Sequence, residues 1–142
     1  MENKGKTIIN VSASVNASID RIWKNWTTPN DIEQWYHASE DWHCPEADND
    51  LRPGGKFLFR MEAKDGSFGF DFEGVYGEIK NNELISYTIG DGRKVTVTFA
   101  GESNSTRVVE IFEAEDVNPI EIQRGGWQAI LDNFKKYAES QL

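Results

Sequence analysis

The sequence has few features that cross-link a chain or anchor it in a membrane. Cys44 is its single cysteine, so no internal disulfide can form, as expected of a protein in a reducing cytoplasm. No apolar run reaches the roughly 18 residues that a membrane-spanning helix needs. The first residues, Met1 to Lys6, precede no apolar stretch typical of a signal peptide. We therefore expect a cytoplasmic protein.

Positive charge is also scarce, with 15 Lys and Arg residues against 24 Asp and Glu residues and a net charge of −9. A surface of this charge repels phosphate groups, which argues against nucleic acid and against an anionic membrane as partners. No acidic block forms a tail, so the charge is also explained by solubility alone. The 38% hydrophobic share is typical of a folded protein. We expect residues 1–142 to form a single domain.

Motifs for metal ligation, phosphate binding and nucleophilic catalysis are missing. The chain has no CxxC, HExxH or GxxxxGK[ST] pattern. Adjacent His43 and Cys44 lack the ligand spacing of common zinc sites. Cys44 with His37 or His43 as its base could act as a nucleophile, but a spare cysteine in a loop is the commoner explanation. We expect neither a metal ion nor a cofactor.

The chain does contain alternating apolar positions typical of strands, framed by segments with helical spacing. Strands are expected over residues 7–13, 56–62, 68–80, 83–89, 94–100 and 105–113. Two short helices are expected after the first strand, over residues 18–27 and 29–35, with Asn16 or Ser18 as the first cap. Residues 37–55 interrupt the pattern and are interpreted as a long loop. Hairpin-length turns between the later strands indicate antiparallel neighbours.

Aromatic residues mark the last helical segment. Gly126-Trp127-Gln128 opens it, and Ile130, Phe134 and Tyr137 follow at helical spacing. A helix with such a stripe must pack on an apolar surface, and the concave face of the sheet is the available one. The prediction is an α+β fold in which a curved six-stranded antiparallel sheet wraps a long carboxy-terminal helix. This geometry encloses a cavity.

Several segments, in this order, resemble a known family. They are IWKNWTTP (22–29), IEQW (32–35), LRPGGKF (51–57), FEGVYGEI (72–79), ISYT (85–88) and GGWQAIL (125–131). Together they resemble the START-like, birch-pollen-allergen-like superfamily, and within it the family of homologues of the activator of heat-shock-protein-90 ATPase. The resemblance implies the helix-grip fold. Relatives bind lipids, hormones and polyketides, and some are cyclases or ring-hydroxylase subunits. The eukaryotic activator contacts its chaperone largely through a separate amino-terminal domain, for which a chain of this length has no room.

The aromatic and polar residues of the sheet and the last helix are the candidate cavity lining. They are Trp35, Phe57, Phe59, Phe70, Phe72, Tyr76, Tyr87, Gln123, Trp127, Ile130 and Phe134. For each of them, ordinary core packing is the alternative. Arg124 is a further polar candidate that could meet an acidic ligand or lie on the surface. The carboxylates Glu62, Asp71, Glu73 and Glu110 alternate with apolar residues and several look solvent-facing, so no acid/base pair stands out.

These observations favour a non-enzymatic domain that binds a small hydrophobic or aromatic ligand in the cavity. Two alternatives stay open. One is a stress-related, co-chaperone-like interaction module that acts on the heat-shock-protein-90 ATPase, as the family name suggests. The other is a cyclase, dehydratase or hydrolase that uses polar residues of the pocket, which would require a buried carboxylate or histidine with a shifted pKa.

Overall fold

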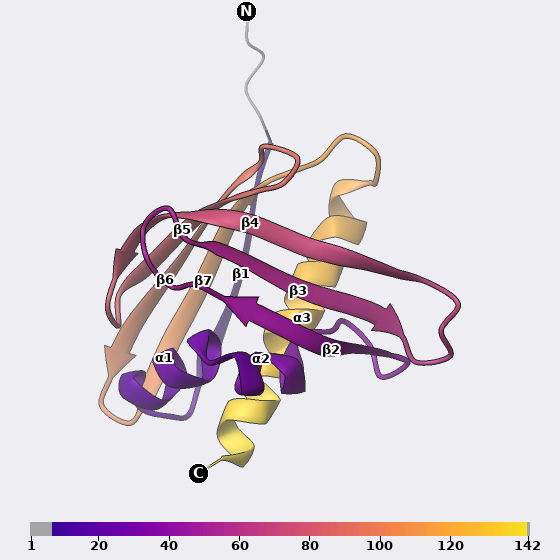
Figure 1. The fold of residues 1–142 in the computed structure, drawn as a ribbon. Coiled ribbons are helices and arrows are strands. Elements are labelled where there is room, and N and C mark those ends of the chain that lie inside the picture. The colour runs from indigo at the N-terminus through magenta and orange to yellow at the C-terminus, as the bar shows by residue number, and fades with distance from the viewer. Residues whose placement is uncertain (1–6, 142) are drawn as a thin grey trace, which may run out of the picture.

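A seven-stranded antiparallel sheet curls around the carboxy-terminal helix in the computed structural model, which describes residues 7–141 (Figure 1). The strands are β1 (Ile8–Val15), β2 (Trp42–Asn49), β3 (Lys56–Ala63), β4 (Gly69–Lys80), β5 (Leu84–Ile89), β6 (Lys94–Glu102) and β7 (Ser105–Glu113). The helices are α1 (Ile19–Thr27), α2 (Pro29–Trp35) and α3 (Ile120–Ser140). None of these helices is long and apolar enough to cross a membrane.

The strand order is β1-β7-β6-β5-β4-β3-β2, and every neighbouring pair is antiparallel. The chain leaves β1 at one edge, passes through α1 and α2, enters β2 at the other edge and returns strand by strand to β7. Tight turns allow this return. Gly66 and Gly92 have φ angles of 78° and 94° in the turns after β3 and β5, a backbone conformation that favours glycine. The expected antiparallel connections are thereby confirmed.

The sheet has seven strands where the sequence predicts six, because β2 lies within the predicted loop 37–55. Its apolar alternation is broken: Cys44 and Ala47 are both buried although they are three positions apart. The pairing with β3 shifts register around Pro45, which is exposed. A bulge on an edge strand accepts a proline because no ladder hydrogen bond is lost there. Because the bulge breaks the alternation of apolar and polar residues, the sequence pattern does not predict this strand.

The two short helices after β1 are present as predicted. Thr28 caps the end of α1 and the start of α2, and Pro29 occupies the first turn of α2. Proline fits there because the first helical N–H groups have no partner in the helix. The indole Nε1 of Trp35 donates a hydrogen bond to the Asn25 carbonyl at 3.1 Å, which ties the two helices together.

Helix α3 begins at Ile120, directly after Pro119, and not at Gly126. On one side it is fixed to the edge strand β1 by two side chains of the helix. The Gln128 amide donates to the Ser12 carbonyl at 3.1 Å, and the Lys135 ammonium donates to the Ser14 carbonyl at 2.8 Å. These bonds use carbonyl groups that an edge strand would otherwise leave to water.

On its other side α3 is fixed to α2. The Asn133 amide donates to the Trp35 carbonyl at 2.9 Å, and the Tyr137 hydroxyl bonds to an Asp31 carboxylate oxygen at 2.6 Å. Both bonds lie in the second half of the helix. This half is therefore held against the body of the protein from two directions.

An aromatic cluster fills the space beneath the second half of α3. The rings of Trp26, Trp35 and Phe134 have centroids 4.8–4.9 Å apart, and Phe134 is fully buried. Phe99 of β6 packs edge-on against Trp26 at 5.6 Å. Rings packed at such distances contribute beyond their buried area. Rings from α1 and α2 thus fill the space between the second half of α3 and the sheet.

We expect two glycine substitutions to change stability in opposite directions. A Cβ at Gly74 would lie 2.6 Å from the Thr88 carbonyl oxygen and 2.8 Å from the Phe57 ring, so Gly74→Ala should destabilise by about 1–3 kcal/mol. Gly125 lies exposed inside α3 with nothing within 4 Å of such a Cβ, so Gly125→Ala should stabilise by up to about 1 kcal/mol. Urea unfolding of both variants measures this, and equal free energies would contradict the packing described.

Candidate functional site

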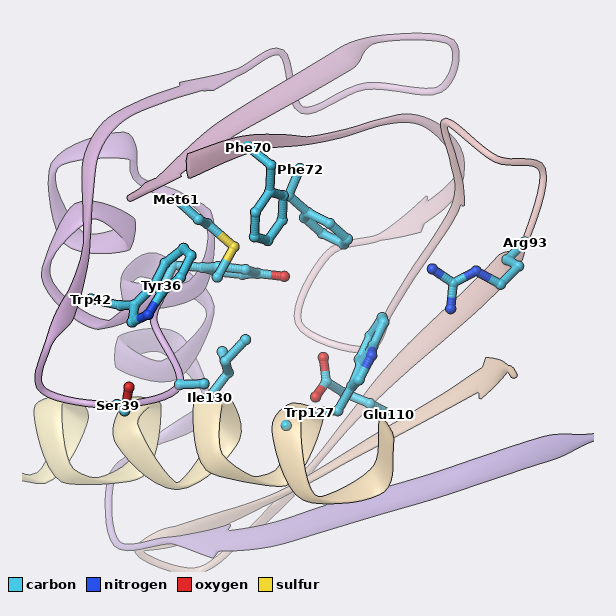
Figure 2. Close-up of a pocket in the computed structure, with 12 residues that line it drawn as sticks. Tyr36, Ser39, Trp42, Met61, Phe70, Phe72, Arg93, Glu110, Trp127 and Ile130 are labelled. Atoms are coloured by element: carbon cyan, nitrogen blue, oxygen red, sulfur yellow. The ribbon is translucent and has the colours of Figure 1, made fainter. Parts of the chain in front are cut away.

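A cavity of about 400 Å³ lies between the first half of α3 and the curled sheet (Figure 2). Its wall comes from the segment between α2 and β2, from β2, β3, β4 and β7, from the turn before β6, and from α3. The lining residues are Tyr36, Ala38, Ser39, Trp42, Met61, Phe70, Phe72, Arg93, Glu110, Gly126, Trp127 and Ile130. This size is within the range of small-molecule sites.

The glycine pair in α3 helps to explain why the cavity is open. Gly126 lines the cavity, and nothing lies within 4 Å of the position that a Cβ would occupy there. A side chain at this position would therefore project into the free space. Gly125 is the neighbouring position and is exposed to solvent. The two glycines are neighbours in the same helix, but one faces the cavity and the other faces solvent.

Aromatic rings make the cavity wall stiff. Trp127 stacks on Phe112 with centroids 3.9 Å apart and planes 12° from parallel, and Phe72 meets Trp127 edge-on at 6.2 Å. Tyr36 stacks on Phe72 at 5.7 Å. Each ring restricts its neighbours, so the wall keeps its shape without a ligand. Phe70 is 43% exposed and lies at the mouth of the cavity.

Glu110 is the buried acidic residue of this wall. Only 4% of it is exposed, and its partners in the ladder are Val11 on β1 and Val97 on β6, both buried. Within residues 7–141 the structure gives its carboxyl group no hydrogen bond and no ion pair. Burial raises the pKa of Glu110 to about 8. The carboxyl group is therefore mostly protonated at neutral pH, which corrects its grouping with the solvent-facing carboxylates.

Two other polar groups reach the same cavity. Figure 2 shows the Tyr36 hydroxyl and the Arg93 guanidinium directed toward the space that Glu110 also faces. The Tyr36 and Tyr87 hydroxyls share a hydrogen bond, and burial above all raises the pKa of both. Arg93 is held by Asp91 at 2.8 Å. The cavity thus combines an apolar wall with a neutral acid, a phenol and a cation near the turn before β6.

The predicted lining residues fall into three groups. One group lines the 400 Å³ cavity and consists of Phe70, Phe72, Trp127 and Ile130. A second group lines a separate void of about 20 Å³ and consists of Trp35, Phe57, Phe59, Tyr76 and Tyr87. The third group, Gln123 and Phe134, lines neither. A void of 20 Å³ holds about one water molecule, so it excludes any larger ligand. The residues of the second group are therefore core residues.

Gln123 does not line the cavity but stabilises the loop before α3 through hydrogen bonds. Its Oε1 accepts a hydrogen bond from the Glu115 N–H at 2.9 Å, and its Nε2 donates to the Asn118 carbonyl at 2.7 Å. These bonds fix the loop that leads into α3. Arg124 forms an ion pair with Glu121 on the surface of the same helix.

Sequence reasoning did not include several residues that line the cavity. They are Tyr36, Ala38, Ser39, Trp42, Met61, Arg93, Glu110 and Gly126. For two of them, the alternation of the sequence could have indicated a position on the buried face. Met61 alternates with Phe57 and Phe59 on one face of β3, and Glu110 alternates with Val108 and Phe112 on β7, all of which are buried. Alternation places a residue on a face, and here it placed a carboxyl group on the apolar face.

His37, His43 and Cys44 of the predicted loop are not among the residues that line the cavity. Burial raises the pKa of the Cys44 thiol to about 11, which opposes the thiolate that a nucleophile needs. Among residues 7–141, no three His, Cys, Asp or Glu side chains come together as a metal site. His37 Nε2 lies 2.9 Å from the Asn133 amide on α3.

A curled antiparallel sheet on a long helix, with an aromatic cavity between them, defines this chain as an α+β domain of the cavity-bearing type. The chain belongs to the family described as Activator of Hsp90 ATPase homolog 1-like protein, whose model matches residues 16–139. No curated protein matches this chain.

Solved structures agree with this family. The AHSA1-like protein from Aeromonas hydrophila is 41% identical with a TM-score of 0.90, over 95% of this chain and 94% of that one. A protein from Cytophaga hutchinsonii is 51% identical with a TM-score of 0.80, over 94% and 92% of the two chains. A protein from Chromobacterium violaceum, 23% identical, shares the fold with a TM-score of 0.84 over 94% and 98%.

We expect the buried Glu110 carboxyl group to make stability fall as pH rises. Its folded pKa of about 8 lies above the ordinary value of 4.5, so the folded state keeps a proton that the unfolded state releases. The free energy of unfolding therefore declines from about pH 4.5 to about pH 8, by several kcal/mol in total. Glu110→Gln removes this decline, because an amide does not ionise.

The measurement is urea unfolding of wild type and Glu110→Gln at pH 5 and pH 8.5. The advantage of the variant should be larger at the higher pH. Glu73→Gln, on an exposed position of β4, is the matched control for loss of one surface charge. If both variants differ from wild type equally at the two pH values, Glu110 is not buried as described.

Proposed function

We propose that this protein binds a small, largely apolar and flat molecule in the cavity between α3 and the sheet. The observation that carries the proposal is the cavity of about 400 Å³ with stacked aromatic walls and few polar groups. Apolar cavities with a small number of placed polar groups are the usual form of small-molecule sites. The stiff wall lowers the cost of binding, because little side-chain freedom is lost when the ligand enters.

The position of Trp127 supports a direct optical test of this proposal. Trp127 and Trp42 line the cavity, whereas Trp23 packs against Phe99 outside it. A ligand in the cavity should therefore change part of the tryptophan emission. Native mass spectrometry of protein purified from its own host would identify a retained ligand and so the chemical class of binder.

We expect Gly126→Leu to block the cavity without disturbing the fold. The new side chain would project into the open space, and leucine favours a helix more than glycine does. The probe is N-phenyl-1-naphthylamine, a neutral aromatic molecule that fluoresces in apolar surroundings. Its affinity should fall at least about tenfold, which corresponds to about 1.4 kcal/mol.

Gly125→Leu is the matched control, because it makes the same change one position away on the exposed face of α3. Probe binding to this variant should equal that of wild type. Equal loss in both variants would point to an effect on the helix, and no loss in either would contradict binding in the cavity.

A second candidate function, acid/base catalysis on the bound molecule, is favoured by Glu110. A buried carboxylic acid with a pKa of about 8 can protonate an oxygen of a substrate at neutral pH, as hydrolysis, dehydration and cyclisation all require. We expect a retained compound to change in mass or in chromatographic retention when it is incubated with wild type but not with Glu110→Gln. An unchanged mass and an unchanged retention time with both proteins would favour binding alone.

A chaperone partnership, which the family description suggests, would use exposed aromatic groups beside the mouth of the cavity. Phe68 is 65% exposed at the hairpin between β3 and β4, beside Trp42 and the partly exposed Phe70. Exposed aromatic groups of this kind are common at protein contacts. Because Gly126→Leu leaves this hairpin untouched, a chaperone contact made there should be insensitive to it.

A further inference from the structure

We infer that Glu110 selects the ligand by donating a hydrogen bond from its carboxyl group to a carbonyl oxygen of the ligand. The inference rests on the proposed binding function and narrows the ligand to flat, largely apolar molecules with a carbonyl group. It comes from the position of Glu110 and from the groups around it.

The position of Glu110 leaves its carboxyl group one direction in which to find a partner. Val11 and Val97 flank it along the sheet, and Gly126, Trp127 and Ile130 of α3 line the same cavity wall region. Figure 2 shows the carboxyl oxygens beside Trp127, facing the free space. A molecule that brings an acceptor into this space therefore gains the free energy of a hydrogen bond with the carboxyl group.

The groups that face Glu110 decide the kind of partner. From the segment after α2 and from β5 come the Tyr36 and Tyr87 hydroxyls, which bond each other and stay neutral because burial raises their pKa. Arg93 reaches the cavity from the turn before β6 and forms an ion pair with Asp91. From β1, β6 and the lining part of α3 come only uncharged side chains. Glu110 therefore meets the ligand as a neutral donor in an apolar surrounding.

An amine is the other partner that a buried carboxyl group could take. Arg93 lines the same cavity, but its charge is offset by Asp91 and it does not exclude an amine by itself. An ammonium group would, however, require Glu110 to ionise among apolar residues, which burial opposes. A neutral carbonyl oxygen needs no such change and accepts the proton of the acid directly.

The test compares two probes of the same shape, 2-acetylnaphthalene and 2-isopropenylnaphthalene. The first has a carbonyl oxygen where the second has a methylene group. By titration calorimetry at pH 6.5, wild type should bind the ketone about tenfold more tightly than the hydrocarbon, the factor expected of one buried hydrogen bond. The amine 1-(2-naphthyl)ethylamine should bind more weakly than the ketone.

Two variants and a change of pH assign this preference to Glu110. Glu110→Gln keeps a donor and should keep the preference, whereas Glu110→Met keeps the length without the donor and should lose it. In wild type the preference should shrink at pH 9, where the carboxyl group has ionised and can no longer donate. In Glu110→Gln it should be the same at both pH values. Circular dichroism checks that both variants are folded.

The outcomes separate the two proposals. If wild type binds ketone and hydrocarbon equally well, the inference about Glu110 is wrong and binding in the cavity stands. If the preference persists in Glu110→Met, another group such as Arg93 recognises the oxygen, and the inference is again wrong. Tighter binding of the amine than of the ketone overturns it as well. If neither naphthalene binds, the inference and the proposed function both fail.

Discussion

The way in which α3 is held against the sheet and against α2 is the constraint on which the other features depend. Its second half is held from two sides, by Lys135 on β1 and by Asn133 and Tyr137 on α2, and Phe134 fills the space beneath it. Its first half carries Gly126 where a side chain could have filled the gap. The first half also touches the sheet, through the stack of Trp127 on Phe112 and the bond from Gln128 to Ser12, but no side chain fills the space beside Gly126. The cavity is the space that remains.

This geometry also explains how a carboxyl group can be buried at Glu110. In a closed core an acid between two valines would have to find a donor or be replaced, because an unpaired polar group in an apolar interior is costly. Here the group borders an open space, so a molecule from outside can supply the missing partner. The cavity and Glu110 thus depend on each other. The open space lowers the free-energy cost of burying the carboxyl group, and the carboxyl group makes the cavity favour ligands that can bond to it.

Periodicity in the sequence was sufficient for most of the fold and for part of the site. The part of α3 from Gly126 onward, the Asp65–Gly66 turn and the alternation of β3 and β7 all follow local rules that act within a few residues, whereas the start of α3 at Ile120 was placed too late. Strand β2 was missed because the bulge at Pro45 breaks the alternation that defines a strand. No local rule describes the cavity, since it depends on how α3 lies against the sheet. Glu110 illustrates both cases. The alternation of β7 predicts which face of the strand it occupies, but no local pattern predicts that this face borders a cavity.

The cost of Glu110 to stability is an argument for its function. Valine is the neighbour of Glu110 on both flanking strands, and a valine in its place would complete an apolar surface against Trp127. A buried acid with a raised pKa instead weakens the folded state whenever the pH approaches that pKa. Such local penalties are concentrated at functional sites, where a group is needed for what it does to another molecule. The aromatic wall alone would hold any apolar molecule of suitable size, whereas the acid distinguishes between them.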